Sequence, residues 1–568
     1  MKENVFSEKR EDFSLVDEPW VILLSKDGKT AKRSLKEAFL EAHSFIDVGG
    51  ELRLQDAAIL RLLTALSVKI LYTYDEHGQE KPLLSRKEAD RRFTAVWKAG
   101  RFCERAVTDY FAKWHDRFYL FDRQYPFYQI PLEGMLTQKD KRLHEETPIL
   151  DCGACMTWLP IPNVNARVQR TENRPYAPYK DISEDRIWAM DYDEAARWLV
   201  FYITYADCTA GQNRRAMCGE LKGRSLKAGF TLPAHGARVT PVGNSLFETI
   251  MLNSCLYYIG NRLYDSCMPA WERDSFDRSV RFDAVMPYDL PQIYTSQSRR
   301  ISLVREDGKV IGMFAAAGEA YMDDHIWKEP TFMIRNEKDK NDDEKINRRV
   351  IHCENSTDAW KEIEYITGSP AYKNKDMNDG AAIVRWVALL ANNEEIIPEG
   401  RVIPFRVTDI AYKQMACGIR AMIEDSVVVG RRFLVNSRMQ RNACEEIERT
   451  KEITIAVYSF GADCSRCMNL SKKDDDKKGK KKDPVGLMLQ RRYTDEIGQV
   501  FRGFIAGRVS LNDLRKAEYD IAVRLVEEYV EENMWSLLKG RGGEEGMNLG
   551  EAYDIFIGRI IKHKPEDD

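Results

Sequence analysis

The order of apolar and polar residues predicts that the chain begins with strands and continues into buried helices. Residues 13–24 are typical of a strand, and residues 26–29 (KDGK) of the turn that follows it. Ser34 has the chemistry of a helix N-cap and predicts a helix through Ala42. Residues 56–71 (DAAILRLLTALSVKIL) are apolar on almost every side. This pattern indicates a helix that is buried all round.

The middle of the chain mixes helical and strand periods. An Asp-Gly pair, Asp307-Gly308, stands between two alternating runs and predicts a tight hairpin. The expected elements are an amphipathic stretch at 87–114, helices at 192–205 and 245–258, hairpin strands at 301–304 and 310–314, and two strands within 401–429 around a tip at 412–418.

From residue 431 onward the pattern is helical to the end. Helices are expected near 432–460 and 485–506, and Ser510 with Asp513 forms a plausible capping box for a third. In the third and fourth helices apolar residues recur every three or four positions, at Leu514, Ala517, Ile521, Leu525 and Tyr529 and at Leu549, Ala552, Phe556 and Ile560. We interpret this part as a four-helix bundle.

These elements predict an α+β protein with two domains. A large mixed α/β domain is expected at residues 1–429, and the C-terminal four-helix bundle at 430–568. Residues 471–483 (SKKDDDKKGKKKD) hold seven lysines and four aspartates, which cannot build a core. We expect this lysine-rich loop to be disordered.

Composition excludes several classes of protein. The 568 residues carry 86 Lys and Arg against 90 Asp and Glu, a net charge of −4, so the chain is neither a strongly basic coat protein nor an acidic disordered one. No apolar run is long enough to span a membrane, and residues 1–13 lack a secretion signal. The 12 scattered cysteines are typical of reduced thiols, so we expect a cytoplasmic protein.

Signatures of common enzymes are missing, and we expect no cofactor. The sequence has no phosphate-binding glycine loop and no H-E-x-x-H zinc motif. Two weaker candidates leave a metal-dependent nuclease open as an alternative function: the dipeptide His115-Asp116, and the C-x-x-C pairs Cys152/Cys155 and Cys464/Cys467. An interaction scaffold that binds no nucleic acid is a further alternative.

Two polar segments are candidates for nucleic-acid contacts. Residues 132–184 form a long stretch of weak periodicity, and loops of this length are commonly functional or disordered. Residues 207–241 are also irregular, and Glu220 is the only acid among the basic residues between 214 and 227. The basic residues are Arg214, Arg215, Lys222, Arg224 and Lys227, and glycines such as Gly223 and Gly229 lie among or just after them.

Several segments, in this order, resemble the CasA family, the large subunit of the type I-E Cascade, a CRISPR RNA-guided surveillance complex. They are FSLVDEPWVILL (13–24), SLKEAFLEAH (34–43), FDRQYPFYQ (121–129), DEAARWLV (193–200), GNSLFETIMLN (243–253), MPAWERD (268–274) and SQSRRISL (296–303). The resemblance implies a mixed α/β domain followed by a four-helix bundle, in agreement with the periodicity.

The resemblance also implies a function without catalysis. Members recognise the protospacer-adjacent motif beside the target in double-stranded DNA, help to open the duplex, and recruit the helicase-nuclease for antiviral defence. The implied partners are the other Cascade subunits, the CRISPR guide RNA, the double-stranded target DNA and the helicase-nuclease, with no membrane. Guide RNA pairing, not the protein, then reads the target sequence.

Three sites are implied by position. Asn163, Val164 and Asn165 resemble, by position, a loop that touches the 5′ handle of the guide RNA. Asparagine amides can form hydrogen bonds with bases or phosphates, which suits that role. The residues Arg214, Arg215, Lys222, Gly223, Arg224, Lys227 and Gly229 resemble a loop that approaches the minor groove of the flanking DNA. Lys413, Gln414 and Met415 resemble the tip of a hairpin whose glutamine wedges under the first target base pair.

Overall fold

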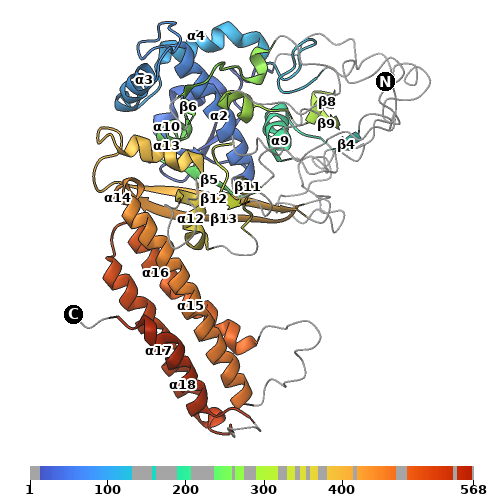
Figure 1. The fold of residues 1–568 in the computed structure, drawn as a ribbon. Coiled ribbons are helices and arrows are strands. Elements are labelled where there is room, and N and C mark those ends of the chain that lie inside the picture. The colour runs from blue at the N-terminus through green and yellow to red at the C-terminus, as the bar shows by residue number, and fades with distance from the viewer. Residues whose placement is uncertain are drawn as a thin grey trace. The chain divides into compact units, whose positions relative to one another are not determined.

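The computed structural model describes residues 13–130, 157–160, 189–205, 236–258, 262–273, 289–297, 299–317, 329–338, 346–353, 358–368, 380–412, 419–468, 483–540 and 546–565. These residues form two compact units (Figure 1). The first takes its residues from Met1–Thr357, Ala381–Ile397 and Phe405–Asp425, and the second from Asp358–Gly380, Pro398–Pro404 and Ser426–Asp568. The first mixes helices and strands and the second is helical, so the expected α+β class is confirmed.

Helix α2 (Arg53–Thr73) is the centre of the first unit, and the helix expected at 56–71 is confirmed. Most of its residues are buried, including polar ones such as Gln55, Asp56 and Arg61. It packs against α9 (Tyr192–Tyr205), α10 (Leu246–Asn253) and α11 (Leu290–Tyr294). Figure 1 shows α9 and α10 beside it. Each large apolar side chain that is fully buried in this way contributes about 1.5–3 kcal/mol.

The N-terminal elements follow the expected order with shorter bounds. Strands β1 (Val21–Ser25), β2 (Thr30–Arg33) and β3 (Phe45–Val48) form an antiparallel sheet in the order β2-β1-β3. The strand expected at 13–24 is wrong in its first half, because Leu15 to Glu18 form a turn held by hydrogen bonds to Ser14 O. Helix α1 (Leu35–Leu40) begins at Ser34, which makes a capping box with Glu37.

Of two expected helical stretches, one is interrupted and the other ends before its apolar pattern does. The stretch at 87–114 divides into α3 (Arg86–Ala99) and α4 (Glu104–Trp114), because Gly100 takes a left-handed conformation with φ +67°. The helix expected at 245–258 has Ser245 as its N-cap but ends at Asn253. Cys255 and Leu256, which follow, are buried but not helical. Their apolar character therefore extended the predicted helix beyond its true end at Asn253.

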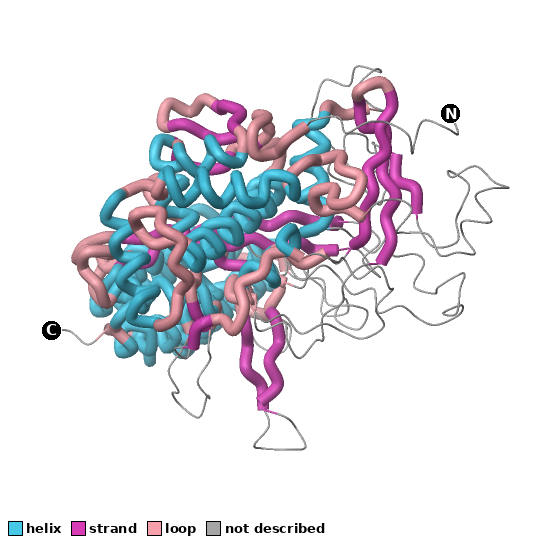
Figure 2. The backbone as a smooth tube through the Cα atoms, turned by 90° about the horizontal axis from the view of Figure 1, so that it is seen from above, coloured by secondary structure: helices cyan, strands magenta, loops and turns pink. Residues whose placement is uncertain are grey.

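The described strands form five small sheets of two or three strands (Figure 2). Strands β8 (Arg299–Glu306) and β9 (Lys309–Ala317) make the expected hairpin, and Asp307 and Gly308 both have positive φ at its turn. β4 (Thr157–Pro160) pairs antiparallel with β9. The remaining pairs are β6 (Tyr257–Tyr258) with β7 (Arg262–Leu263), β10 (Ile334–Lys338) with β11 (Ile346–Val350), and the sheet β13-β12-β5 treated below.

Four long helices dominate the second unit. They are α15 (Ser437–Cys467), α16 (Pro484–Ile505), α17 (Leu511–Leu537) and α18 (Leu549–Ile560). Helix α15 packs against the other three, and α16 also packs against α17. Gly461 and Gly486 allow α15 and α16 to approach closely, since a Cβ on Gly461 would lie 2.6 Å from the Gly486 Cα atom. The lysine-rich segment 471–483 lies outside the described residues, apart from Asp483.

A buried ionic cluster crosses the bundle. The Glu518 carboxylate accepts a hydrogen bond from the Thr450 hydroxyl at 2.7 Å and lies 2.7 Å from Arg449 Nε. Its neighbour Glu446 accepts two hydrogen bonds from Arg515, at 2.8 and 2.7 Å. Burial, and then the adjacent Glu446, raise the pKa of Glu518 to about 8.

None of the described helices is both long enough and apolar enough to cross a membrane.

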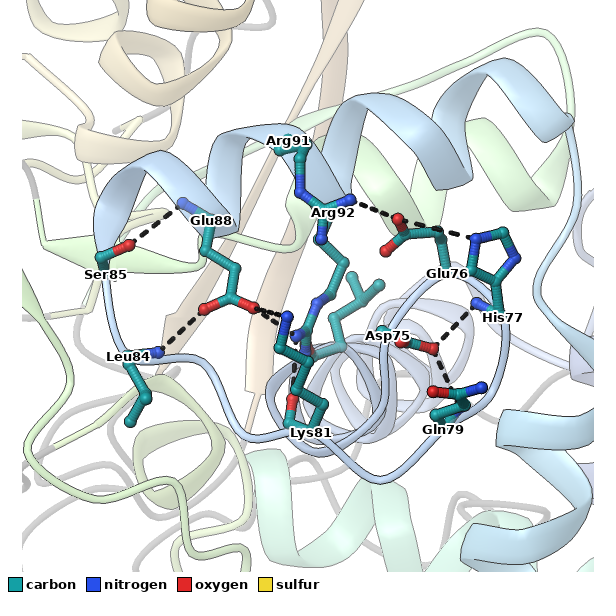
Figure 3. A network of polar contacts seen from close by, with 11 residues as sticks. Asp75, Glu76, His77, Gln79, Lys81, Leu84, Ser85, Glu88, Arg91 and Arg92 are labelled. Atoms are coloured by element: carbon teal, nitrogen blue, oxygen red, sulfur yellow. Dashed lines mark hydrogen bonds and ion pairs between the residues drawn. The ribbon is translucent and has the colours of Figure 1, made fainter.

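A second network surrounds the buried Arg92 of α3 (Figure 3). Its guanidinium donates at 2.8 Å to the carbonyls of Leu71 and of Lys81, and it lies 3.3 Å from Glu88. The neighbouring Arg91 is exposed and pairs with Glu76. Arg92 therefore ties the end of α2 and the segment that follows it to α3.

Replacing Arg92 should destabilise the first unit far more than replacing Arg91. In Arg92→Ala, the main-chain carbonyls of Leu71 and Lys81 and the Glu88 carboxylate each lose a donor, and a fully buried side chain is removed, so we expect a loss of roughly 3–5 kcal/mol in the free energy of unfolding. Arg91→Ala is the matched control and should cost about 1 kcal/mol or less, because its ion pair is exposed to solvent. Urea unfolding followed by near-ultraviolet circular dichroism measures both. Equal losses in the two variants would contradict the structural role of Arg92.

Candidate nucleic-acid interface

The strands on either side of the expected wedge form a sheet with a third strand. β12 (Val402–Tyr412) lies between β13 (Ile419–Gly430) and β5 (Arg238–Pro241), which agrees with the two strands expected within 401–429. β12 and β5 are antiparallel, with Phe405 opposite Pro241. Residues 413–418 connect β12 to β13, and the predicted wedge residues Lys413, Gln414 and Met415 lie there, outside the described residues.

Charged side chains hold the base of this strand pair. Arg406 of β12 donates to Asp47 of β3 at 2.5 Å and lies 3.8 Å from Glu424 of β13. Arg53, at the start of α2, lies 3.8 Å from Asp47 and 3.9 Å from Glu424. Two arginines thus alternate with two carboxylates, and this network links β12 and β13 to the central helix.

Asp409 provides a second attachment on β12. One oxygen of its buried carboxylate accepts from the Cys353 backbone N–H at 2.7 Å. The other accepts from the Ile410 N–H at 2.7 Å and lies 3.4 Å from His352 Nδ1. β12 therefore pairs with β5 along one edge. Nearer its C-terminal end, β12 is also held to residues 352–353 through the Asp409 carboxylate, which accepts from the Cys353 N–H.

Asp56 lies beside the network but differs from it in its ionisation. Its carboxylate accepts from the Gly50 N–H at 2.6 Å and lies 3.5 Å from Arg53. Burial, together with repulsion from Asp47, raises the pKa of Asp56 to about 7, against the lowering effects of the Gly50 N–H and Arg53. Asp56 therefore changes its charge near neutral pH at the point where the strand pair meets α2.

The other two predicted sites also lie outside the described residues. These are the handle residues Asn163, Val164 and Asn165, and the basic residues Arg214, Arg215, Lys222, Gly223, Arg224, Lys227 and Gly229. The described neighbours of both are anchored. β4 ends at Pro160 against Gly312 of β9, and α9 ends at Tyr205 while β5 begins at Arg238.

The candidates for metal chemistry are not brought together where they are described. His115 Nε2 lies 2.6 Å from Asp17 Oδ2, and its Nδ1 lies 3.4 Å from the Tyr119 hydroxyl. Cys464 and Cys467 are buried, and burial raises the pKa of both thiols, which disfavours the thiolate that binds zinc. Cys152 and Cys155 lie outside the described residues. Within the described ranges, no three His, Cys, Asp or Glu side chains are grouped to hold a metal.

The segments that carry the family resemblance build the core of the first unit. Gln129 accepts from the Leu303 N–H at 2.8 Å, so the segments at 121–129 and 296–303 are joined directly. Trp271, in the segment at 268–274, donates from its indole to the Tyr110 hydroxyl at 2.8 Å. The residues of the base network, by contrast, were missed by sequence reasoning. Arg406 and Asp47 are 359 positions apart, and no local pattern marks them as partners.

The comparisons place a chain with this fold and these packing segments among CRISPR-associated proteins. The model of the family described as CRISPR-associated protein Cse1 matches residues 14–532, so the chain belongs to the Cse1 family. The family expected from the sequence, CasA, is thereby confirmed. A curated relative, CRISPR-associated protein CasA/Cse1 of Thermus thermophilus, is 27% identical over 247 residues. That match spans 44% of this chain and 40% of the relative.

Solved structures share the fold over nearly the whole chain. Thermobifida fusca Cse1 has a TM-score of 0.70 at 19% identity, covering 97% of each chain. Cse1 from Acidimicrobium ferrooxidans has a TM-score of 0.69 at 18% identity, covering 98% of this chain and 99% of that one. A chain of a structure described as a CRISPR RNA-guided surveillance complex has a TM-score of 0.59 at 15% identity, covering 97% and 99%.

Asp56→Asn should change how stability depends on pH. The folded-state pKa of about 7 lies above the ordinary value of 3.8, so the folded state binds the extra proton between these values. Stability from this group is present below pH 4 and is lost as pH rises through 7. Between pH 5 and pH 8 the free energy of unfolding of the wild-type protein should therefore fall by roughly 2–3 kcal/mol more than that of Asp56→Asn.

Asp75→Asn is a control of opposite sign. Hydrogen bonds from the backbone N–H groups of His77 and Gln79 lower the pKa of Asp75 against the effect of burial, so its contribution is lost only on acidification below the ordinary value of 3.8. Urea unfolding at several pH values measures both variants. If the curves of wild type and Asp56→Asn run parallel from pH 5 to pH 8, Asp56 does not titrate as described.

Proposed function

We propose that this protein is the non-catalytic large subunit of an RNA-guided CRISPR surveillance complex. The observation that carries the proposal is the Cse1 family match over residues 14–532, together with a shared fold over 97% of the chain with a protein in such a complex. The other subunits of the complex and the guide RNA are then its constitutive partners. Sequence specificity rests with guide pairing, and the protein contributes shape and motif recognition.

Recognition of the flanking DNA is assigned to the basic segment between α9 and β5. Its arginines and lysines offer contacts to phosphates, and Gly223 and Gly229 permit a close approach of the backbone to the minor groove. The minor groove displays a degenerate pattern of acceptors, so the motif read there should be permissive. Binding of target is then followed by recruitment of the helicase-nuclease.

Opening of the duplex is assigned to Gln414, between β12 and β13. The base network of Arg406, Asp47, Arg53 and Glu424 supports this role, because a wedge transmits force only if its base is held. The amide of glutamine can both donate to and accept from the base edges that separation exposes. Asn163 and Asn165 are assigned to the handle of the guide RNA for the same chemical reason.

Guide RNA should co-purify when this chain is isolated with the other subunits of its complex. The double variant Asn163→Ala, Asn165→Ala should reduce retention of the chain on the guide-bound complex roughly tenfold or more, since two hydrogen bonds of about 1 kcal/mol each are lost. Asn392→Ala, an exposed asparagine at the end of α13 (Ala382–Ala391), is the control. Retention is measured by pulldown and quantitative staining. Wild-type stoichiometry in the double variant would refute the handle contact.

Gln414→Ala should slow strand separation and spare binding to a target that is already open. Separating one base pair costs about 1–2 kcal/mol of stacking, so opening of a linear duplex should slow roughly 5–30-fold. The 2-aminopurine fluorescence of a base at the first target position follows the kinetics. Negative supercoiling should partly restore the rate, because it supplies opening energy. An equal defect on paired and pre-opened targets would assign Gln414 to general binding instead.

The proposal is separable from the alternative of a metal-dependent nuclease. Purified protein with Mg²⁺ or Mn²⁺ should not cleave DNA or RNA. Cleavage that is abolished by His115→Ala would favour the nuclease, since His115-Asp116 is one of the two candidate metal sites on which that alternative rests.

A further inference from the structure

A small cavity of mixed polar and apolar lining lies inside the first unit, between α2, β5, α10 and α11. It has a volume of about 20 Å³, and the polar part of its lining includes Arg61, Thr64, Arg238, Asn253, Tyr294 and Thr331. This volume exceeds the roughly 10–15 Å³ that one water-sized group requires. Guanidinium, hydroxyl and amide groups stand among the apolar atoms of the lining, and they distinguish it from the wholly apolar cavities that stay empty in protein cores.

The lining carries more positive than negative charge. Arg61 and Arg238 expose only 7% and 4% of their surface. Arg61 Nη2 donates to Glu329 at 2.9 Å, and this is the one ion pair that the described residues provide to the two arginines. Four guanidinium nitrogens have no acceptor within the described part of the chain: Nε and Nη1 of Arg61, and Nε and Nη2 of Arg238. The Tyr294 hydroxyl has none there either.

Such an arrangement is costly unless something neutralises it. A buried charge without a partner costs several kcal/mol. The rings of Tyr294 and Tyr205 lie 4.1 and 4.5 Å from the guanidinium carbons of Arg61 and Arg238, and these contacts offset only part of the cost. Water can accept the free N–H groups, but it does not cancel the excess charge. An anion does both.

We propose that this cavity is a binding site for a single phosphoryl or similar tetrahedral oxyanion. Guanidinium groups match the oxygens of such an ion in pairs, and two of them with a hydroxyl donor are a typical set for a phosphate. Burial raises the pKa of Tyr294 well above its ordinary value, so its hydroxyl stays a donor. The cavity is too small and too enclosed for a phosphodiester with its flanking sugars, so the ligand is a free oxyanion such as inorganic phosphate.

The site is connected to the strand pair that carries the wedge. Arg238 stands opposite Thr408 in the register between β5 and β12, and its backbone also bridges to Phe332. An anion held by Arg61 and Arg238 therefore fastens β5 to α2. Bound anion should slow hydrogen exchange of the β12 amides that bond to β5 as well as raise the overall stability.

The test is thermal unfolding of the full chain while phosphate replaces chloride at constant ionic strength. We expect a saturable rise in the melting temperature of wild type, on the order of 2–5 °C. Arg238→Gln should lose the saturable rise and should be no less stable than wild type without phosphate, because an unpaired buried charge has been removed. Tyr294→Phe should weaken the response. Tyr128→Phe removes a buried hydroxyl that is equally without a partner in the described structure but lies outside the cavity lining, and it should respond like wild type.

The variants separate binding from the general stabilisation that phosphate gives to proteins, which does not saturate and affects all variants alike. No difference between wild type and Arg238→Gln would overturn the proposal. In crystals grown with selenate, anomalous scattering should lie between Arg61 and Arg238, and ordered water alone at that position would overturn it as well.

Discussion

The first unit depends on the burial of α2 on all of its sides. A helix that is surrounded completely offers apolar surface to every neighbour, and α9, α10 and α11 all pack directly on it. Its burial is the main source of stabilisation that the surrounding short elements share, because the sheets that the described residues form have only two or three strands each and little core of their own. The geometry of each attached element is therefore set by its contact with one helix.

The same burial determines where polar chemistry can occur. Buried charged residues on α2 must be neutralised by other elements, and they are met in different ways. Asp56, near the start of the helix, is buried beside Asp47 of β3 and Arg406 of β12, and the half-exposed Arg53 lies between Asp47 and Glu424 of β13. Arg61, two turns further on, meets Glu329 and the cavity. Strand attachment and anion binding are thus two outcomes of one constraint.

Local sequence patterns predicted most helices and strands, but they did not predict the contacts between residues that are distant in the sequence. Ser34, Ser245 and Ser510 mark helix starts because capping needs only neighbours, and Asp307-Gly308 marks a hairpin because positive φ selects its residues. The break at Gly100 and the end of α10 were missed, since the apolar pattern continues past both. The base network was not predictable, because its charges meet only after folding. The roles predicted for the interface residues came from family resemblance, although local charge had already marked the basic run at 214–227 as a candidate.

Arg92 illustrates how such a fold tolerates sequence change. Two of its three acceptors are main-chain carbonyls, of Leu71 and Lys81. Trp20 donates in the same way to the Leu15 carbonyl, Lys69 to that of Cys267, and Gln129 to that of Leu120. A carbonyl is present whatever side chain its residue carries, so each bond is vulnerable to mutation at one end only. One partner in each such hydrogen bond is therefore unaffected by side-chain substitution. A chain built in this way can diverge widely in its side chains before its architecture is lost.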